Sequence, residues 1–278
     1  MMKYKMLRAA DTFITHIILI IVALIFLFPC LWLILASFSK SGSIYTYKGF
    51  FPSEYSLDTF KTLFTDTAMY NYPKWFMNTL LIAIFSSLMG TFLVILTAYT
   101  MSRFNFKSRK KIMKGTLVLG MFPSFMGMIA VYIIMTQFGL INKLWGVILI
   151  YSSCAPMGYL TQKGFFDTIH CSIDEAAKID GATNAQIFLK INLPLSLPMI
   201  VYTALTSFTF PWSDFILPKL LLKEKNLYTV AVGLMSLGET EFSRFAAGAV
   251  FIAVPIVILY FILIRYMING MTSGAVKG

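Results

Sequence analysis

The sequence has few charged residues and lacks the motifs of common catalytic sites. Charged side chains make up 13% of its 278 residues, and Asp and Glu together number only 12. It contains neither the G-x-x-x-x-G-K-[ST] loop that cradles ATP phosphates nor the H-E-x-x-H zinc motif. Two histidines and three cysteines have no metal-like or paired spacing: His16, His170, Cys30, Cys154 and Cys171. The chain is therefore predicted to hold no metal and no cofactor.

Apolar residues, in contrast, are abundant. Hydrophobic side chains make up 58% of the chain, far from the balance of an ordinary soluble domain. A helix needs about 20 apolar residues to cross a bilayer, because its backbone groups must be satisfied within the segment. Six stretches approach or exceed this length: 13–36, 76–100, 112–136, 144–161, 197–217 and 246–268. The sequence predicts an all-α, polytopic membrane protein in which residues 1–278 form a single transmembrane domain.

The net charge of +11 comes from basic residues spread over short segments between the apolar stretches. This distribution indicates membrane topology rather than nucleic-acid binding, because Lys and Arg collect on the cytoplasmic side. The densest cluster, residues 103–114, lies between the second and third stretches. With six crossings, both termini, this cluster and the segment that follows the fourth stretch are predicted to be cytoplasmic.

Acidic residues within or near the apolar stretches are too few for membrane-embedded catalysis. Asp11 and Asp214 are predicted on opposite sides of the membrane, so they cannot form a carboxylate pair. An ion-driven secondary transporter would show intramembrane charge relays and inverted repeats, and neither is evident. We expect a transport protein that is not an enzyme and whose energy comes from another polypeptide.

A polar, amphipathic segment at 172–194 interrupts the apolar sequence, and we call it the polar island. Its pattern predicts two short helices. Ser172 with Glu175 and Thr183 with Gln186 fit capping boxes, in which side chains satisfy the first backbone N–H groups of a helix. Between these pairs Gly181 is expected to close the first helix. Pro194 is expected to end the second. Two such helices have no core of their own and need a partner surface.

The same segment carries a spaced motif. Glu175-Ala176-Ala177, three residues, Gly181, nine residues and then Ile191-Asn192-Leu193-Pro194 follow the pattern EAA-x3-G-x9-I-x-LP. This pattern resembles the signature of the membrane-spanning subunits of bacterial ABC importers, and no signature position departs from it. Asp180-Gly181-Ala182 and the tail at 274–278 look like the carbohydrate-uptake branch, in particular the MalG-like maltodextrin permeases.

The resemblance implies the type I ABC importer permease fold, with six transmembrane helices and a cytoplasmic coupling-helix loop. It also implies a multi-pass position in a bacterial inner or plasma membrane. The partners would be a second, MalF-like permease, two ABC ATPase subunits that bind ATP and Mg²⁺, and an extracellular or periplasmic sugar-binding protein. The ATPase-docking residues would be these: Glu175, Ala176, Ala177, Asp180, Gly181, Ala182, Ile191, Leu193 and Pro194.

Two further groups of residues follow from the resemblance. The segment 211–215 is similar to the W-x-D-F stretch of sugar permeases, with Ser213 where the family more often has Asn. It makes Ser207, Trp212 and Asp214 candidates for the translocation pathway, although a helix-packing role for Asp214 is an equal alternative. An external loop at 219–244 corresponds to the loop that reaches the binding protein in MalG-like relatives, with these candidate contacts: Tyr228, Gly233, Leu234, Gly238 and Glu239.

The leading hypothesis is thus a permease subunit that moves maltodextrin-like oligosaccharides into a bacterial cell. ABC permeases for other solutes, such as galacto-oligosaccharides or glycerol-phosphate, are alternatives within the same class. An ion-driven transporter is the alternative from a different class, and it leaves the polar island unexplained.

Overall fold

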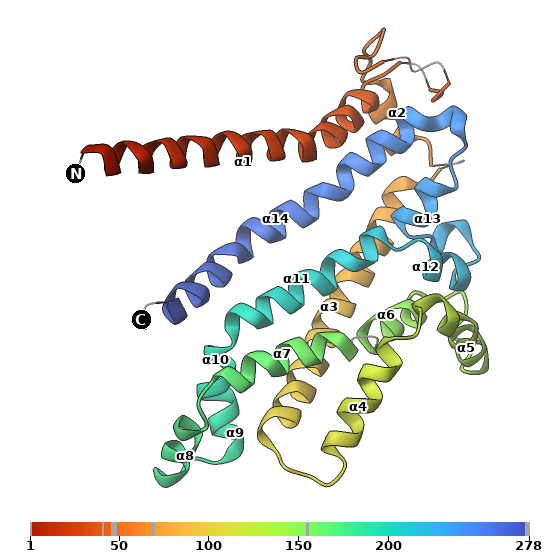
Figure 1. The fold of residues 1–278 in the computed structure, drawn as a ribbon. Coiled ribbons are helices and arrows are strands. Elements are labelled where there is room, and N and C mark those ends of the chain that lie inside the picture. The colour runs from red at the N-terminus through yellow and green to blue at the C-terminus, as the bar shows by residue number, and fades with distance from the viewer. Residues whose placement is uncertain (1, 41, 46–48, 68–69, 154–155, 276–278) are drawn as a thin grey trace. The chain divides into compact units, whose positions relative to one another are not determined.

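A computed structural model describes the backbone of residues 2–40, 42–45, 49–67, 70–153 and 156–275. In this part of the chain the regular structure is helical (Figure 1), apart from one isolated antiparallel bridge between Ser39 and Tyr55. The α-helices are these: α1 (Met2–Ser37), α2 (Asp58–Thr65), α3 (Tyr72–Arg103), α4 (Arg109–Gly120), α5 (Ser124–Gln137), α6 (Leu144–Ser153), α7 (Pro156–Thr168), α8 (Cys171–Ile179), α9 (Asn184–Ile187), α10 (Leu193–Leu195), α11 (Leu197–Ser213), α12 (Ile216–Leu221), α13 (Val230–Met235) and α14 (Phe242–Ala275). The all-α prediction is confirmed.

Three continuous helices are long and apolar enough to cross a membrane: Thr12–Ser37, Tyr72–Arg103 and Glu239–Met267. Three further crossings arise only if each of three bent helix pairs counts as one span. The pairs are α4 with α5, α6 with α7, and the helical segment at 184–195 with α11. The described residues therefore hold between three and six candidate spans. The predicted number of six is reached only if each bent pair is counted as one span.

Two of the bends follow from local sequence. Pro123 precedes α5, and Pro156 begins α7, so each break falls where a proline cannot supply a backbone N–H to a continuing helix. The fifth predicted span was too long at its carboxyl end, because α11 stops at Ser213 and Leu217 belongs to the separate helix α12.

The described chain forms two compact units. Unit 1 comprises residues 1–70 and 234–251, and unit 2 comprises residues 71–233 and 252–278. Both α13 and α14 contribute residues to each unit. The prediction of one transmembrane domain stays a prediction.

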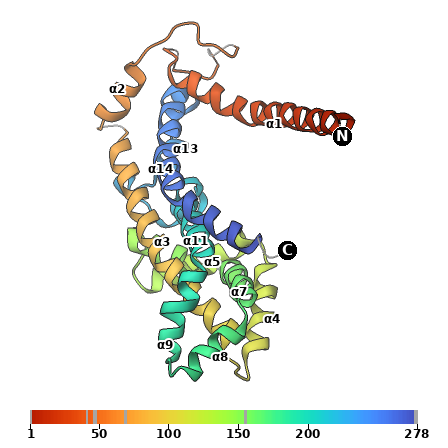
Figure 2. The same ribbon diagram turned by 90° about the vertical axis from the view of Figure 1, so that its left-hand side faces the viewer.

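Unit 2 is organised around α3, which packs against α6, α7 and α11 (Figures 1 and 2). Small or β-branched residues on its inner side, such as Ala83, Gly90 and Ala98, are buried and allow close approach of the neighbouring helices. Toward one end of α3, Trp212 of α11 packs edge-on to Phe76 with ring centroids 5.1 Å apart. The interior of unit 2 therefore lies along α3.

The amino-terminal end of α3 also holds the segment at 225–233 by four hydrogen bonds. Trp75 Nε1 donates to the Lys225 carbonyl at 2.8 Å, and Asn78 Nδ2 donates to the carbonyls of Asn226 and Tyr228. The backbone N–H of Val230 donates to Thr79 Oγ1 at 2.8 Å. Because these donors and acceptors are partly or fully buried, the loop that follows α12 is fixed to α3.

In unit 1, the polar segment that follows α1 is hydrogen-bonded to the residues at the start of α14. The backbone N–H of Ile44 donates to the Glu239 carbonyl, and that of Ser243 donates to the Gly42 carbonyl. Arg244 lies over the Tyr70 ring, 4.9 Å from its centroid, and 3.8 Å from the Asp66 carboxylate. The short helix α2 begins at Asp58, in the same unit.

A glycine at the α3 contact gives a direct test of this packing. A Cβ at Gly233 would lie 2.0 Å from Cε3 of the Trp75 ring, so the ring or the loop must move. We expect Gly233→Ala to lower the free energy of unfolding by about 3 kcal/mol, the upper part of the usual range for overpacking. Thermal unfolding of the purified protein in detergent measures the change.

The matched control is Gly164→Ala on α7, where no atom lies within 4 Å of the added Cβ. Because alanine favours a helix over glycine by about 1 kcal/mol, this variant should be neutral or slightly stabilised. Equal effects of the two substitutions would contradict the packing of Gly233 on Trp75.

Candidate functional site

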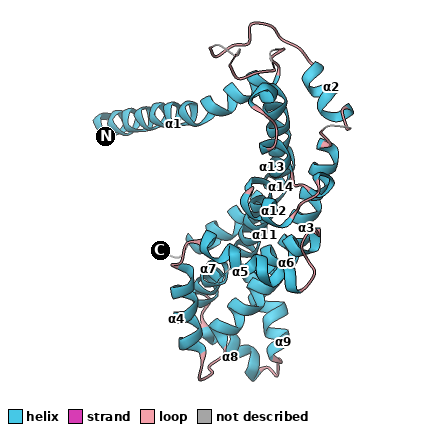
Figure 3. Cartoon of the chain, turned by 90° about the vertical axis from the view of Figure 1, so that its right-hand side faces the viewer, coloured by secondary structure: helices cyan, strands magenta, loops and turns pink. Residues whose placement is uncertain are grey.

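The polar island folds as a chain of short helices at one end of unit 2, near the end of α3 (Figures 1 and 3). It begins in α8 and turns at 180–183. It then continues through α9, a π-helical segment at Phe188–Asn192, and α10. The two predicted helices are therefore present, but the second is longer and less regular than the sequence indicated.

The turn of the polar island is fixed as its sequence predicted. Thr183 Oγ1 accepts from the Gln186 N–H, and Gln186 Oε1 accepts from the Thr183 N–H at 2.8 Å, so this capping box is confirmed. Gly181 has a φ of 84°, in the left-handed region that favours glycine. The capping box predicted for Ser172 and Glu175 is wrong, because α8 already begins at Cys171, and its N-cap, His170, makes no side-chain cap.

Pro194 was wrongly predicted to end the second helix. It lies two residues after the end of the π-helical segment, one residue before the helical path at 184–195 ends. The helical backbone continues to Leu195, and a bend of 76° separates it from α11. The π-helical segment before Pro194 was not predicted by any feature of the sequence. Single π turns are frequent at functional sites.

One side of the polar island is packed onto the helices of unit 2. Ile187 is buried, and Phe188 packs against Tyr99 of α3 with ring centroids 4.5 Å apart. Phe188 and Leu193 both border a buried apolar cluster that includes Tyr99 and Phe166 of α7. The second helical part of the island thus finds its partner surface within this chain.

The other side of the polar island has no partner among the described residues. On α8, Ile179 is 87% exposed, and Glu175 and Ala176 are exposed as well. The remaining candidate docking residues divide between exposed and half-buried positions: Asp180, Gly181 and Pro194 are exposed, and Ala177, Ala182, Ile191 and Leu193 are half-buried. An exposed isoleucine beside an exposed carboxylate makes α8 a surface with both apolar and acidic character.

A buried ionic cluster joins the polar island to α3. Arg103, at the last turn of α3, places Nε 3.0 Å from Oδ2 of Asp174, in the first turn of α8, and both side chains are under 10% exposed. Asn192 Nδ2 donates to Asp174 Oδ1 at 2.8 Å, and Asn192 Oδ1 accepts from Arg103 Nη2 at 3.1 Å. Removing one partner of such a pair leaves an uncompensated buried charge, which costs roughly 3–5 kcal/mol.

Sequence reasoning missed this cluster. Asp174 directly precedes the signature, Asn192 occupies a position that the signature leaves unspecified, and Arg103 was interpreted only as part of a topology signal. The three residues are 18 to 89 positions apart in the chain. No local spacing rule links them.

The candidate pathway residues lie on or just after α11, in different environments. Trp212 is 1% exposed and packs with Phe76 and Phe208 inside unit 2. Asp214 accepts from the Tyr151 hydroxyl at 2.8 Å and from the Ile216 backbone N–H at 2.9 Å, so it both joins α6 and caps α12. Ser207 is half-buried. A role of these residues in a pathway stays a prediction.

The candidate contacts with a binding protein are divided in a similar way. Tyr228, Gly233 and Leu234 are buried, whereas Gly238 and Glu239 are exposed. The Glu239 carboxylate accepts from the Tyr45 hydroxyl, and this bond raises the pKa of the Tyr45 phenol. The two exposed residues remain candidates for a contact outside the chain.

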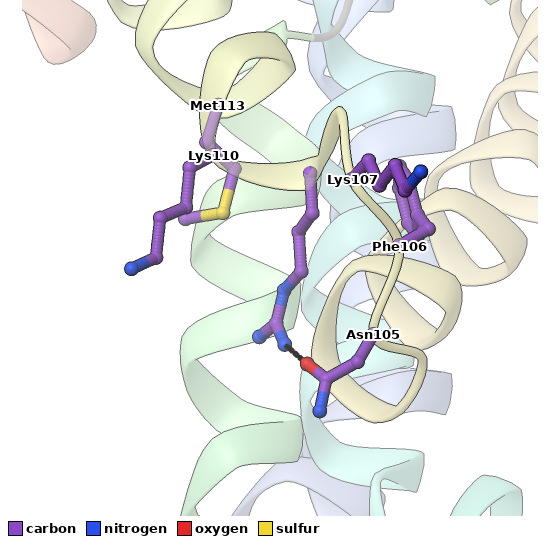
Figure 4. A pocket seen from close by; sticks show the side chains of 6 residues that line it. Asn105, Phe106, Lys107, Lys110 and Met113 are labelled. Carbon is purple, nitrogen blue, oxygen red and sulfur yellow. Dashed lines mark hydrogen bonds between the residues drawn. The ribbon is translucent and has the colours of Figure 1, made fainter.

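An open hollow of about 650 Å³ lies beside the basic loop between α3 and α4 (Figure 4). It is lined by these residues: Asn105, Phe106, Lys107, Arg109, Lys110 and Met113. Arg109 Nη1 donates to Asn105 Oδ1 at 2.9 Å, while Lys107 and Lys110 extend to opposite sides of the loop in this view. Because the charges diverge, the hollow is an open flank of the loop rather than an enclosed ligand site.

Comparison with protein families gives a match over residues 90–273, to the family described as "Binding-protein-dependent transport system inner membrane component". Among curated proteins, the chain is 36% identical to the maltodextrin transport system permease protein MalD of Streptococcus pneumoniae, over 99% of this chain and 98% of the relative. It is 35% identical to the galactooligosaccharides transport system permease protein GanQ of Bacillus subtilis, with the same coverage. It is 31% identical to MalG of Escherichia coli, over 98% of this chain and 97% of the relative.

Among solved structures, the chain resembles a chain of a bacterial ABC transporter involved in the import of the acidic polysaccharide alginate. The TM-score is 0.75 at 20% identity, and the alignment covers 93% of this chain and 96% of the other. At this identity the likeness establishes a shared fold.

The turn of the polar island can be tested at Gly181. No atom lies within 4 Å of a Cβ added there, so Gly181→Ala acts on backbone conformation alone. We expect it to destabilise the island by about 1–2 kcal/mol, the cost of a left-handed conformation for an ordinary residue. Hydrogen exchange of the amides at 171–195 should become faster. Gly181→Asn is the matched control and should cost less, because asparagine tolerates this region of φ.

Proposed function

Because this chain belongs to the family of binding-protein-dependent transport system inner membrane components, we propose that it is the permease subunit of a bacterial oligosaccharide importer, driven through its polar island by a separate ATPase. Sugar transport by an ABC importer is the activity of the maltodextrin permeases that it resembles over nearly its full length. Such permeases are transport subunits and not enzymes. Membership in this family does not support the ion-driven alternative.

The docking proposal rests on the exposure of one side of α8. A transported sugar would not need an apolar and acidic surface on a helix at the end of the bundle, but a second protein would. Ile179, at 87% exposure, offers apolar area to bury, and Glu175 offers a charge for a complementary cation. We propose that this surface, with Ala176, Asp180 and Gly181, seats on an ATPase subunit that binds ATP and Mg²⁺.

The orientation of the chain supports this assignment. The basic loop at 103–114 favours the cytoplasmic side, and the Arg103–Asp174 ion pair joins this loop to the polar island. We therefore propose that the island lies on the same side of the membrane as the loop. We propose that both termini are also cytoplasmic and that the protein lies in the inner or plasma membrane.

Motion at the polar island would change access to the pathway. Closure of two ATPase subunits on ATP would move the docked α8, and with it the helices of unit 2, between inward-facing and outward-facing arrangements. Such coupling needs two discrete states that ATP binding favours differently. A second permease related to this one would supply the other wall of the pathway, and Ser207, Trp212 and Asp214 are proposed to lie near it.

A sugar-binding protein on the opposite side of the membrane would deliver the substrate. Gly238 and Glu239 are exposed and are the proposed contacts, whereas Tyr228, Gly233 and Leu234 would act by holding the loop in place. Maltodextrins are the proposed substrate, and galacto-oligosaccharides are the second candidate because a comparably similar relative transports them. A glycerol-phosphate substrate has no support among these relatives.

The function is tested with the purified complex in lipid vesicles. We expect this chain to co-purify with a second permease and an ATPase, and we expect maltodextrin with its binding protein to stimulate ATP hydrolysis. The panel should include maltotriose, a galacto-oligosaccharide and glycerol 3-phosphate. Stimulation by the galacto-oligosaccharide alone would replace the proposed substrate, and transport without an ATPase subunit would refute the assignment as a whole.

The docking surface is tested by Glu175→Lys. Since the side chain is exposed, we expect the complex to fold, while sugar uptake per ATP hydrolysed falls roughly tenfold because a charge contact is reversed. Glu175→Gln, which removes the charge without reversing it, should have a smaller effect. Normal uptake by the lysine variant would exclude Glu175 from the docking surface.

A further inference from the structure

The connection between the polar island and the rest of unit 2 has to carry force if the proposed function is correct. The covalent connections are poorly suited to this task. Residues 169 and 170 separate α7 from α8, and a bend of 76° separates α10 from α11. Each is a break in the helical backbone at which the chain can hinge.

The apolar contacts of the polar island hold it but do not fix its direction. Phe188 and Leu193 lie against the cluster around Tyr99. Apolar contacts are non-directional, and their free energy depends on buried area rather than on orientation. Hydrogen bonds, which depend on angle, constrain its orientation more sharply.

Arg103 supplies directional bonds to three parts of the chain at once. Its Nη1 donates to Cys171 Sγ in α8 at 3.5 Å, and its Nη2 donates to the Ile169 carbonyl, after α7, at 2.9 Å. Its Nε lies 3.0 Å from Asp174 Oδ2 as an ion pair without hydrogen-bond geometry. Its Nη2 also donates to Asn192 in the π-helical segment. A guanidinium is planar and rigid, so these bonds fix angles as well as distances.

The cluster is closed and buried. Asn192 is fully buried and bridges the other two side chains, accepting from Arg103 and donating to Asp174. Asp174 also lies in the first turn of α8, where the free N–H groups of a helix favour a carboxylate. Electrostatic interactions are stronger where water is excluded, so the cluster resists displacement of any one member.

We propose that Arg103 is a positioning residue that makes α3 and the polar island move as one body, so that displacement of α8 by the ATPase reaches the interior of the transporter. Asp174 and Asn192 complete this clamp. The proposal rests on the proposed function and deepens it. A purely structural role for the cluster is the competing explanation, and the two differ in what happens when the cluster is replaced by apolar side chains.

The first test compares two single substitutions in the complete transporter, reconstituted with its binding protein. Arg103→Gln removes a buried cation whose ion pair joins α3 to α8. Lys163→Gln removes a buried cation whose ion pair with Asp167 stays within α7. We expect uptake per ATP hydrolysed to fall about 2- to 30-fold for the first, the range observed for residues that couple sites. The second should stay near wild type. Equal behaviour of the two variants would overturn the proposal.

The second test keeps the packing and removes the directional bonds. In Arg103→Met/Asp174→Leu/Asn192→Leu, apolar side chains of similar volume replace the cluster, a change that other proteins tolerate without loss of stability. We expect this variant to assemble with its partners and hydrolyse ATP, yet to import little sugar per ATP. Normal import would show that the cluster only supports the fold.

Arg103→Lys is the conservative variant. It retains the charge but not the planar fork, so import per ATP should be intermediate between wild type and Arg103→Gln. If Arg103→Lys imports as poorly as Arg103→Gln, coupling depends on the planar shape of the guanidinium and not on charge alone. Full import by Arg103→Lys would show that the guanidinium is not required. Failure of the wild-type complex to couple ATP hydrolysis to import would refute the proposed function instead, before any variant is compared.

Discussion

Packing around α3 is the constraint on which the rest of unit 2 depends. Half of the most apolar part of this helix is buried within the chain, compared with none of α1 and 11% of α14. A helix in a bilayer gains little from moving its apolar side chains out of lipid, so close packing of small residues and a few polar bonds must hold it to its neighbours. Ala83, Gly90 and Ala98 are the small residues that allow this close packing. Ser87 makes one of the polar bonds, because its hydroxyl donates to the Ala204 carbonyl.

Both ends of α3 are fixed by polar side chains that are rare in the apolar part of the chain. At one end Asn78 and Thr79 hold the segment at 225–233, and at the other Arg103 holds the polar island. One continuous helix, long and apolar enough to cross a membrane, thus holds a loop at one end and the polar island at the other.

The positions of the apolar helices could be predicted from the sequence because length and hydropathy are local properties. The turn at Gly181 and the Thr183–Gln186 capping box could be predicted for the same reason, since each depends on residues within one turn. The box at Ser172 could not, because the same pattern fits inside a helix that begins at Cys171, two residues earlier than a cap at Ser172 requires. The Arg103–Asp174–Asn192 cluster depends on tertiary packing, which a single sequence does not encode in any readable spacing.

The π-helical segment at Phe188–Asn192 places an additional residue within a helical path that would otherwise be regular. Each residue of an α-helix turns the chain by about 100°. The wide turn at Phe188–Asn192 takes up the additional residue, because its backbone bonds from i+5 rather than from i+4. One residue fewer or more elsewhere in this path would rotate Asn192 by about 100° and carry its amide away from Arg103. The wide turn thus lets a longer chain reach Arg103 with Asn192 still facing it.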